Sequence, residues 1–373
     1  MKILSVVGAR PNFVKIAPLM REMAERPSIT RILVHTGQHY DARMSDGFFE
    51  ALGIPAPDVN LGVGSGSHSQ QTAEVMKRLE PVLESVRPDV VLVVGDVNST
   101  LAAALVAAKL GIRVAHVEAG LRSFDRSMPE EINRLLTDAI ADDLFATEES
   151  AVMNLAREGV PSERVHFVGN VMIDALRLTR GRWTTSTVFR DLGLQPGQRY
   201  GAVTLHRPAN VDDPRRLREI VGALREVAAE LPLIFPVHPR ARTRLAAENV
   251  TWLGPSEPVP PRGLVCTEPL GYLDFVALVS RAAVVLTDSG GIQEETTLLG
   301  VPCLTLRENT ERPVTVTQGT NRVIGVLPGR IVQEGLRALA HPPTPQPPPP
   351  FWDGYAARRI VDVLLGVAVE AAA

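Results

Sequence analysis

The sequence predicts an α/β protein of two domains, each built around a parallel β-sheet. Short apolar runs such as ILSVVG, DVVLVVGD and YGAVTLH alternate with longer segments of helical periodicity. These runs are continuously apolar rather than alternating, as expected for strands that helices cover on both faces. At 373 residues the chain is also longer than one ordinary hydrophobic core, so two domains are expected.

The order strand–helix–strand recurs in both halves of the chain. In the first half, ILSVVG leads into FVKIAPLMREMAE and RILVHTG, and DVVLVVGD leads through STLAAALVAAKLG to IRVAHVEAG. The pattern weakens between residues 176 and 200 and restarts with YGAVTLH, PLIFPVH and AVVLTDS. We therefore expect domains over residues 1–170 and 171–340, with the interdomain segment near residues 170–198.

The C-terminal part of the chain predicts a spacer and a final helix. Residues 341–350 read HPPTPQPPPP, and proline fixes φ and removes backbone donors, so we expect a stiff linker over 341–352. Residues 353–373 contain the amphipathic pattern YAARRIVDVLLGVAVEAA. We expect them to form a helix that packs back on the N-terminal domain.

Composition excludes several classes of protein. The net charge is −3, which does not favour a nucleic-acid or membrane-surface partner. Cys266 and Cys303, the only cysteines, have neither metal-ligand nor redox spacing, so a reducing cytoplasmic location is expected. No apolar run reaches the roughly 18 residues of a membrane span. Clustered metal ligands and a GxGxxG turn are also lacking, so we expect neither a metal nor a nicotinamide cofactor.

Polar residues just beyond the predicted strands of the first half are candidate site residues, because open parallel sheets bind ligands there. Arg10 follows the first strand and could bind a phosphate or a sugar, or lie in a plain turn. Asp96 follows DVVLVVG, where helix capping would also explain an acid. Capping does not explain Glu118, since a glycine turn follows it. Glu130 and Glu131 begin a helix, and the helix dipole accounts for one of them.

The stretch LTDSGGIQEE gives the strongest local signal in the second half. Its strand ends at Thr287, and the backbone of Ser289–Gly291 opens a helix whose free N–H groups can bind a pyrophosphate. Glu294 or Glu295 could accept hydrogen bonds from two ribose hydroxyls, and Arg312 could add positive charge. A glycine-rich tight turn is the alternative.

Two histidines also end strands in the second half, in VTLHRPAN and FPVHP. A structural role and a catalytic role are about equally plausible for His206 and His238. Together these patterns predict a second domain that holds a nucleoside diphosphate and a first domain that supplies carboxylates. Such a combination suggests chemistry on a group attached to the nucleotide, most simply a sugar.

Seven stretches, in order, resemble the non-hydrolysing UDP-N-acetylglucosamine 2-epimerases of bacteria. They are GARPNFVKIAPL, TGQHYD, GDVNSTLAAALVAAKLGIRVAHVEAGLRSFDRSMPEEINR, TLHRPAN, PVHP, LTDSGGIQEE and ENTERPVTV, within residues 1–340. The resemblance implies two Rossmann-like domains that face a cleft, the glycosyltransferase-B architecture. It also implies a homodimer that interconverts UDP-GlcNAc and UDP-ManNAc without a cofactor.

The resemblance implies a reaction in two stages. UDP leaves C1 and a carboxylate takes the C2 proton, which gives 2-acetamidoglucal; UDP then re-adds while a second acid protonates the opposite face. The acid/base residues implied are Asp96, Glu118, Glu130 and His206. The substrate contacts expected are Arg10, Lys15, Arg134, His238, Phe275 (against the uracil), Ser289, Gly290, Gly291, Glu295 and Arg312.

The chain departs from the family pattern in two places. Asn12 stands where many members carry Glu, and Gln38-His39 continues as YDARMSD, which leaves allosteric activation by UDP-GlcNAc open. Relatives that act on modified sugars, such as UDP-linked 2,3-diacetamido uronates, share that continuation. Three alternatives therefore stay open: epimerisation of such a sugar, a glycosyltransferase of the same architecture, and a non-catalytic UDP-sugar sensor.

Overall fold

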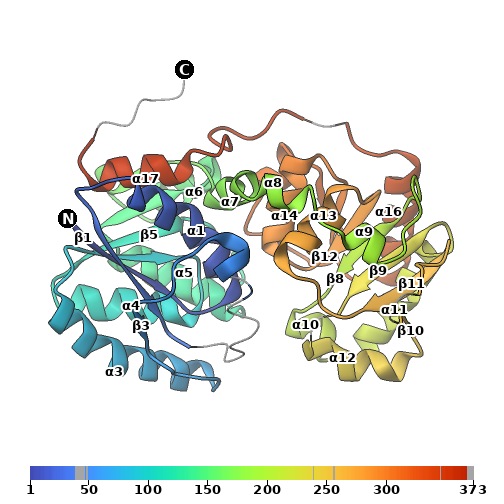
Figure 1. The fold of residues 1–373 in the computed structure, drawn as a ribbon, viewed down its shortest axis with the longest axis horizontal. Coiled ribbons are helices and arrows are strands. Elements are labelled where there is room, and N and C mark those ends of the chain that lie inside the picture. Colours follow the sequence, from blue (N-terminus) through green and yellow to red (C-terminus); the bar gives the residue numbers. More distant parts are fainter. Residues whose placement is uncertain (38–46, 48, 238, 255–256, 345, 368–373) are drawn as a thin grey trace. The chain divides into compact units, whose positions relative to one another are not determined.

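The computed structural model describes residues 1–373 except 38–46, 48, 238, 255–256, 345 and 368–373. Its contacts divide the chain into two compact units, which are coloured along the sequence in Figure 1. Unit 1 comprises residues 1–178 and 349–373, and unit 2 comprises residues 179–348. Each unit contains a 7-stranded parallel sheet, which confirms the predicted fold class.

The sheet of unit 1 has the strand order β3-β2-β1-β4-β5-β6-β7. Its strands are β1 (Lys2–Val7), β2 (Thr30–His35), β3 (Val59–Asn60), β4 (Val90–Val94), β5 (Arg113–Ala119), β6 (Asp143–Ala146) and β7 (Val165–Phe167). All residues of β4 are buried, because helices cover both faces of the sheet, and this explains its uninterrupted apolar sequence.

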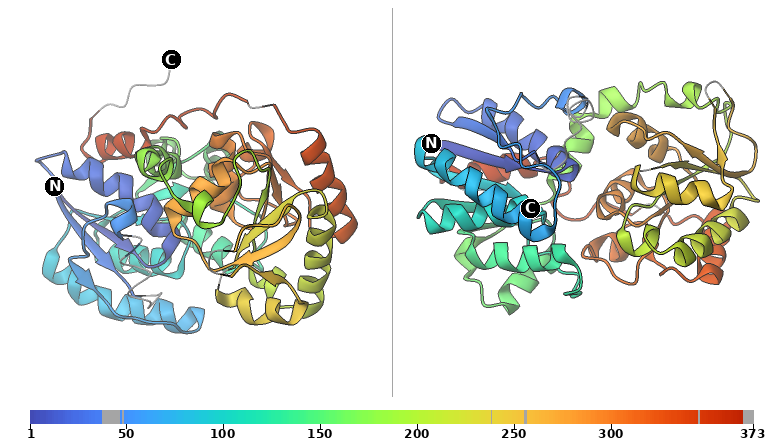
Figure 2. Two further views of the ribbon diagram at one scale, coloured as in Figure 1. Left: turned by 45° about the vertical axis from the view of Figure 1, so that its right-hand side comes forward. Right: turned by 90° about the horizontal axis from the view of Figure 1, so that it is seen from below.

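The helices of unit 1 form two layers. They are α1 (Arg10–Ala24), α3 (His68–Val86), α4 (Asn98–Lys109), α5 (Pro129–Ile140), α6 (Glu149–Arg157), α7 (Val171–Leu178) and α17 (Ala356–Leu364), with a 3-10 turn at Ser162–Arg164. Helix α1 packs against α7 and α17, and α4 packs against α3 and α5. The views in Figures 1 and 2 place α1 and α17 on the face of the sheet opposite α3 and α4.

The sheet of unit 2 has the order β10-β11-β9-β8-β12-β13-β14. Its strands are β8 (Gly201–Thr204), β9 (Pro232–Pro236), β10 (Thr251–Trp252), β11 (Gly263–Thr267), β12 (Val284–Thr287), β13 (Cys303–Thr305) and β14 (Asn321–Val323). Its helices are α8 (Arg180–Trp183), α9 (Val188–Asp191), α10 (Pro208–Val211), α11 (Pro214–Val227), α12 (Pro239–Leu245), α13 (Tyr272–Ser280), α14 (Gly290–Leu299), α15 (Val314–Thr317) and α16 (Pro328–Ala340), with a 3-10 turn at Ala246–Glu248.

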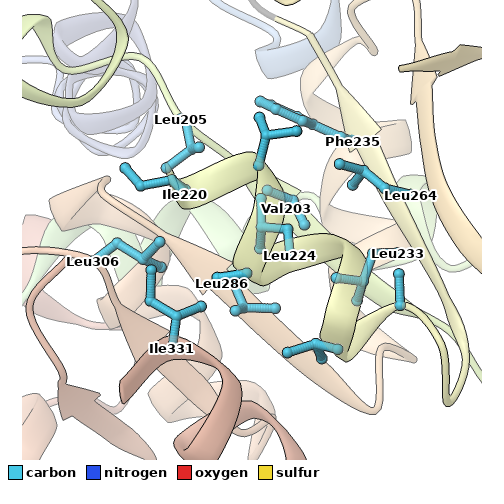
Figure 3. Close-up of a cluster of buried hydrophobic side chains, with 14 of the residues drawn as sticks. Val203, Leu205, Ile220, Leu224, Leu233, Phe235, Leu264, Leu286, Leu306 and Ile331 are labelled. Atoms are coloured by element: carbon cyan, nitrogen blue, oxygen red, sulfur yellow. The ribbon is translucent and has the colours of Figure 1, made fainter. Parts of the chain in front are cut away.

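One face of the unit 2 sheet carries the hydrophobic core shown in Figure 3. Ile220 and Leu224 of α11 lie over Val203 of β8 and Phe235 of β9, and Ile331 of α16 joins them. All five side chains are fully buried. This packing holds β8 and β12 side by side. His206 lies in the loop after β8, and Ser289 and the start of α14 follow β12.

The boundary between the units differs from the expected one. We placed it after residue 170, but α7 packs against α1, so unit 1 extends to Leu178. The expected interdomain segment holds α8 and α9, which pack against α13 of unit 2. The C-terminal segment returns to unit 1 from Pro349 onward, and α17 packs against α1 and α7. No helix in the described ranges is long and apolar enough to cross a membrane.

Candidate active site

Glu118 lies at an irregularity in strand β5. The pairing register of β5 with β6 shifts between Val117 and Ala119, so Glu118 occupies a bulge, and its φ is 73°. This left-handed conformation costs a non-glycine residue about 1–2 kcal/mol. Bulges re-aim side chains, and backbone strain of this kind collects at functional sites. The bulge therefore takes one carboxylate out of the regular pattern of β5 before its pairing with β6 resumes at Ala119.

The Glu118 carboxylate forms a buried ion pair with the ammonium group of Lys15 in helix α1. Both side chains are almost completely enclosed, at 4% and 6% exposure. A Cβ on Gly95 would lie 2.9 Å from Lys15 Nζ and 3.5 Å from Glu118 Oε2. Gly95, with φ 69°, therefore gives the pair the space it needs at the end of β4. The structure thus brings together two residues that are far apart in the sequence.

Asp96 is held by a second charged network. Arg134 of α5 donates to Asp96 Oδ2 at 2.5 Å and to Glu131 Oε2 at 2.5 Å. Burial would raise the pKa of Glu131, but hydrogen bonds from the Ser123 N–H, Arg134 and the Phe124 N–H lower it below its ordinary value. Glu131 is thus a structural carboxylate that orients Arg134. Its role goes beyond the helix-dipole compensation that the sequence suggested.

Glu130 has a different environment from the other two acids. It lies in the first turn of α5 and is half-buried. Within the part of the chain that the structure describes, its carboxylate makes no hydrogen bond or ion pair. Asp96 pairs with an arginine and Glu118 with a lysine, so the three acids are held in three distinct ways.

Asn12 and Arg10 lie where the first turn meets helix α1. Arg10 begins the helix and is half-buried. The Asn12 side chain accepts hydrogen bonds from the N–H groups of Gly8 and Ala9, each at 3.2 Å, and donates to the Val94 carbonyl at 2.8 Å. It thereby ties the turn after β1 to the end of β4, a role that needs an amide donor.

His116 and Asp138 form a buried pair behind the acid residues. His116 Nδ1 lies 2.6 Å from Asp138 Oδ1, and Nε2 lies 2.8 Å from the Gly95 carbonyl oxygen. Burial would raise the pKa of Asp138, but the charges and hydrogen bonds of His116 and Arg122 lower it. Both ring nitrogens of His116 therefore face acceptors, and the ring fixes the turn that carries Asp96.

In unit 2 the start of helix α14 follows strand β12 directly. Ser289 is the N-cap, and Gly290 and Gly291 form the first turn. A Cβ on Gly290 would lie 2.4 Å from Arg312 Nη1, so the backbone approaches the guanidinium closely. Arg312 is buried, forms an ion pair with Glu294 in which Nε lies 2.7 Å from Oε1, and also contacts Glu311. Free N–H groups and a fixed arginine make this helix end suitable for a diphosphate.

Glu295 lies further along the same helix and is fully buried. Burial raises its pKa to about 8; a hydrogen bond from the Tyr272 hydroxyl offsets part of this rise, and the charge of Glu294 adds to it. Phe275 is half-buried in α13, the helix that also carries Tyr272. When the Glu295 carboxyl loses its proton, both of its oxygens can only accept. The ionised form is therefore the better acceptor for two hydroxyl donors.

His206 follows strand β8, and its ring contacts the residue that follows β12. His206 Nδ1 lies 3.0 Å from Asp288 Oδ1, and the His206 side chain is 42% exposed. Asp288 was not among the residues we predicted from the sequence. The prediction for His238 falls outside the described residues.

The family model for UDP-N-acetylglucosamine 2-epimerase matches residues 21–365 of the chain. The chain belongs to this family. A UDP-N-acetylglucosamine 2-epimerase of Methanocaldococcus jannaschii is 42% identical over 370 residues, which cover 98% of this chain and 99% of that protein. A UDP-2,3-diacetamido-2,3-dideoxy-D-glucuronate 2-epimerase of Pseudomonas aeruginosa is 42% identical over 342 residues, 91% of this chain and 92% of that one.

Solved structures give the same picture of the epimerase family. The crystal structure of the Methanocaldococcus jannaschii UDP-GlcNAc 2-epimerase in complex with UDP-GlcNAc and UDP has a TM-score of 0.88 at 41% sequence identity. It covers 98% of this chain and 100% of that one. These findings confirm the resemblance that we read from the sequence.

The epimerase family pattern alone did not predict several partners of the site residues. Glu131, Asp138 and Asp288 are buried carboxylates that hold, respectively, Arg134, His116 and His206. Position was the sequence signal for two of them, because Asp288 directly follows a strand and Glu131 begins a helix, whereas Asp138 lies inside α5. Among the described residues no group of three or more His, Cys, Asp and Glu side chains could hold a metal ion.

Proposed function

We propose that this chain is an epimerase that inverts C2 of UDP-N-acetylglucosamine and gives UDP-N-acetylmannosamine. The observation that carries the proposal is Glu118, a buried carboxylate that a strained bulge directs toward Lys15. Binding of a UDP-sugar requires no such carboxylate, and neither does transfer of the sugar to an acceptor. An acid/base group built in this way, in a chain of this family, supports proton transfer at carbon.

Unit 2 would hold the nucleotide and stabilise it as a leaving group. The N–H groups at the start of α14 and the Arg312 guanidinium would bind the diphosphate, and Glu295 would accept from the ribose hydroxyls. As the bond between C1 and the phosphate oxygen breaks, the negative charge on the diphosphate grows. Donors that are already oriented stabilise this charge without further rearrangement.

Unit 1 would supply the groups that act at C2. Loss of UDP leaves positive charge at C1, which acidifies the C2 hydrogen, and a carboxylate removes that proton to form 2-acetamidoglucal. UDP then adds back to C1 while a second acid protonates C2 on the opposite face. Two faces require two groups in different protonation states. Glu118, Asp96 and Glu130, with their three distinct environments, can meet this requirement.

The decisive experiment is turnover in deuterium oxide. Purified protein is incubated with UDP-GlcNAc alone, and the products are analysed by proton NMR and mass spectrometry. We expect UDP-ManNAc to form with one deuterium at C2. A glycosyltransferase would give no turnover without an acceptor, and a sensor would bind the nucleotide without exchange, so either result would refute the proposal.

A modified UDP-sugar is the second candidate substrate. The Pseudomonas aeruginosa diacetamido-glucuronate epimerase is as similar to this chain, at 42% identity, as the Methanocaldococcus jannaschii UDP-GlcNAc epimerase. The same deuterium assay over a panel of UDP-sugars distinguishes the two. Preferred exchange into a UDP-linked 2,3-diacetamido uronate would replace UDP-GlcNAc as the substrate and keep the reaction.

Two further properties, the oligomeric state and the location in the cell, are part of the proposal. We propose that the protein is a homodimer, which light scattering of the purified chain would test by its mass. We also propose that it works in the cytoplasm. Cys266 and Cys303 are buried thiols that form no disulfide, as suits a reducing compartment.

A further inference from the structure

Two loops of unit 2 are joined by a single buried carboxylate. Strands β8 and β12 are parallel neighbours, with Thr204 opposite Thr287, so their carboxyl ends lie side by side. Asp288 directly follows β12 and has 0% exposure. His206 begins the loop after β8, one residue beyond Leu205. The pairing of the two strands therefore places the acid against the histidine.

The Asp288 carboxylate receives donors from three residues of the opposite loop. The backbone N–H groups of His206 and Arg207 donate to it at 3.1 and 3.0 Å, and Asn210 Nδ2 donates at 3.1 Å. His206 Nδ1 completes the set at 3.0 Å. An ionised carboxylate offers about four acceptor sites, so these donors use its capacity.

The protonation of Asp288 determines which nitrogen of His206 carries hydrogen. Burial would raise the pKa of Asp288, but the charge and hydrogen bond of His206, with the Arg207 N–H and Asn210, lower it below its ordinary value. An ionised carboxylate can only accept. Nδ1 of His206 must therefore be the donor, and the neutral ring has its lone pair on Nε2.

A second histidine–aspartate pair, His116 with Asp138, serves as an internal comparison. His116 is fully buried, and its Nε2 lies against the Gly95 carbonyl as its Nδ1 lies against Asp138. Both nitrogens of His116 thus serve the fold. The His206 side chain is 42% exposed, so the same carboxylate contact holds a ring that solvent or a ligand can reach.

We propose that Asp288 is a positioning residue of the reaction: it holds His206 as the Nδ1–H tautomer and leaves Nε2 as the nitrogen that accepts a proton or hydrogen bond from the substrate. This inference rests on the proposed function for its link to turnover. Its structural part, the tautomer, does not depend on the identity of the substrate. Asp288 itself would not touch the substrate.

The test combines Asp288→Asn with NMR of the histidine rings. In the variant the amide oxygen can still accept the backbone N–H groups, but the amide NH2 would donate to Nδ1 and move the ring hydrogen to Nε2. We expect kcat to fall roughly 10²–10⁴-fold with KM nearly unchanged, since a reversed tautomer removes the accepting nitrogen. Asp213→Asn, which changes an exposed acid whose amide can still accept from the Arg215 N–H, should keep both the tautomer and kcat.

The spectra are recorded on the full chain without nucleotide, after labelling its eight histidines with 15N. Loss of one set of signals in His206→Gln assigns the ring. Hydrogen on Nδ1 in the wild type and on Nε2 in Asp288→Asn supports the inference. Hydrogen on Nε2 in the wild type overturns it even if the variant does not fold, as does an active Asp288→Asn with kcat within about threefold of the wild type.

The two proposals fail in different ways. A wild-type protein that shows the Nδ1–H tautomer but exchanges no deuterium into any UDP-sugar would contradict the proposed function, and with it the link between Asp288 and turnover. Epimerase activity in the wild type, together with an unchanged tautomer in Asp288→Asn, would contradict the inference about Asp288 alone.

Discussion

Glu118 combines three features. It lies in a strand bulge with φ 73°, it is buried, and it pairs with the equally buried Lys15. Backbone strain and the burial of a charge both cost stability. If the role of this position were purely structural, another residue type would be more stable here. The arrangement is understandable if the carboxylate handles a proton at carbon.

We expect Glu118→Gln to separate binding from chemistry. The amide keeps the size of the side chain but cannot take a proton, so turnover should fall about 10²–10⁴-fold. UDP binding, measured by calorimetry, should stay close to that of the wild type. Glu74→Gln, which changes a partly exposed carboxylate of α3, is the matched control and should leave both unchanged. Normal turnover in Glu118→Gln would remove the role given to this residue.

Glu295 makes nucleotide binding sensitive to pH. Its pKa of about 8 in the ligand-free protein means that it is mostly protonated at pH 7. Two ribose hydroxyls can donate to it together only when it is ionised. Binding of UDP should therefore release a proton, and the affinity for UDP should rise as the pH rises from 7 toward 8.5, by at most about tenfold per unit.

Calorimetry in two buffers of different ionisation enthalpy measures this proton release directly. Above pH 7 the phosphates of UDP are themselves ionised, so the protein is the main source of the proton. Glu295→Gln has no proton to lose and should bind UDP without release. Equal proton release by the wild type and by Glu295→Gln would show that another group is responsible.

At the scale of single residues the sequence predicted positions better than partners. The ends of the apolar runs placed Asp96, Glu118 and His206 at strand termini, because strand ends follow from local pattern. The bulge at Glu118 and the pairing of His206 with Asp288 depend on strands that lie far apart in the sequence. No local pattern contains such contacts, and Asp288 was missed for this reason.

At the scale of elements, the C-terminal segment completes unit 1. Trp352 is buried, and its indole N–H donates to the Thr147 carbonyl at 3.1 Å. Asp174 of α7 accepts from the N–H groups of Ala356 and Ala357, which are the first residues of α17. The Asp174 carboxylate therefore both caps α17 and holds it against α7. Burial raises the pKa of Asp174 to about 6.

We expect Trp352→Ala to destabilise unit 1 by about 3–5 kcal/mol, since it removes a large side chain from a packed site. Tyr355→Ala changes an exposed aromatic residue three positions later and should have an effect below about 0.5 kcal/mol. Guanidinium unfolding gives both values, and hydrogen exchange should show faster exchange of the α17 amides in Trp352→Ala alone. Equal effects of the two substitutions would mean that the segment is not docked as described.

The sequence predicted the elements of each sheet more reliably than the boundaries between the units. Fully buried strands such as β4 have uninterrupted apolar runs, which can be recognised in the sequence. The role of α7 was not visible, because its membership in unit 1 follows from packing against α1 rather than from its own pattern. The proline run suggested a spacer to residue 352, yet the segment from Pro349 onward belongs to unit 1.

At the scale of the whole molecule, the chain passes from unit 1 to unit 2 after Leu178 and back before Pro349. A chain that ends after Pro348 keeps all of unit 2 and removes Trp352 and α17 from unit 1. We expect limited proteolysis of this truncated chain to digest residues 1–178 rapidly and to leave a resistant fragment near residues 179–348. Resistance of both parts would show that unit 1 does not need its C-terminal segment.

The split composition of unit 1 also sets the order in which the protein can fold during synthesis. Unit 1 begins first, but its final helix leaves the ribosome only after all of unit 2, residues 179–348, has been made. At about 5–20 residues per second, that interval is roughly 10–35 s. Unit 2 can therefore finish first, while the surfaces of α1 and α7 that α17 later covers stay exposed to chaperones and to other nascent chains.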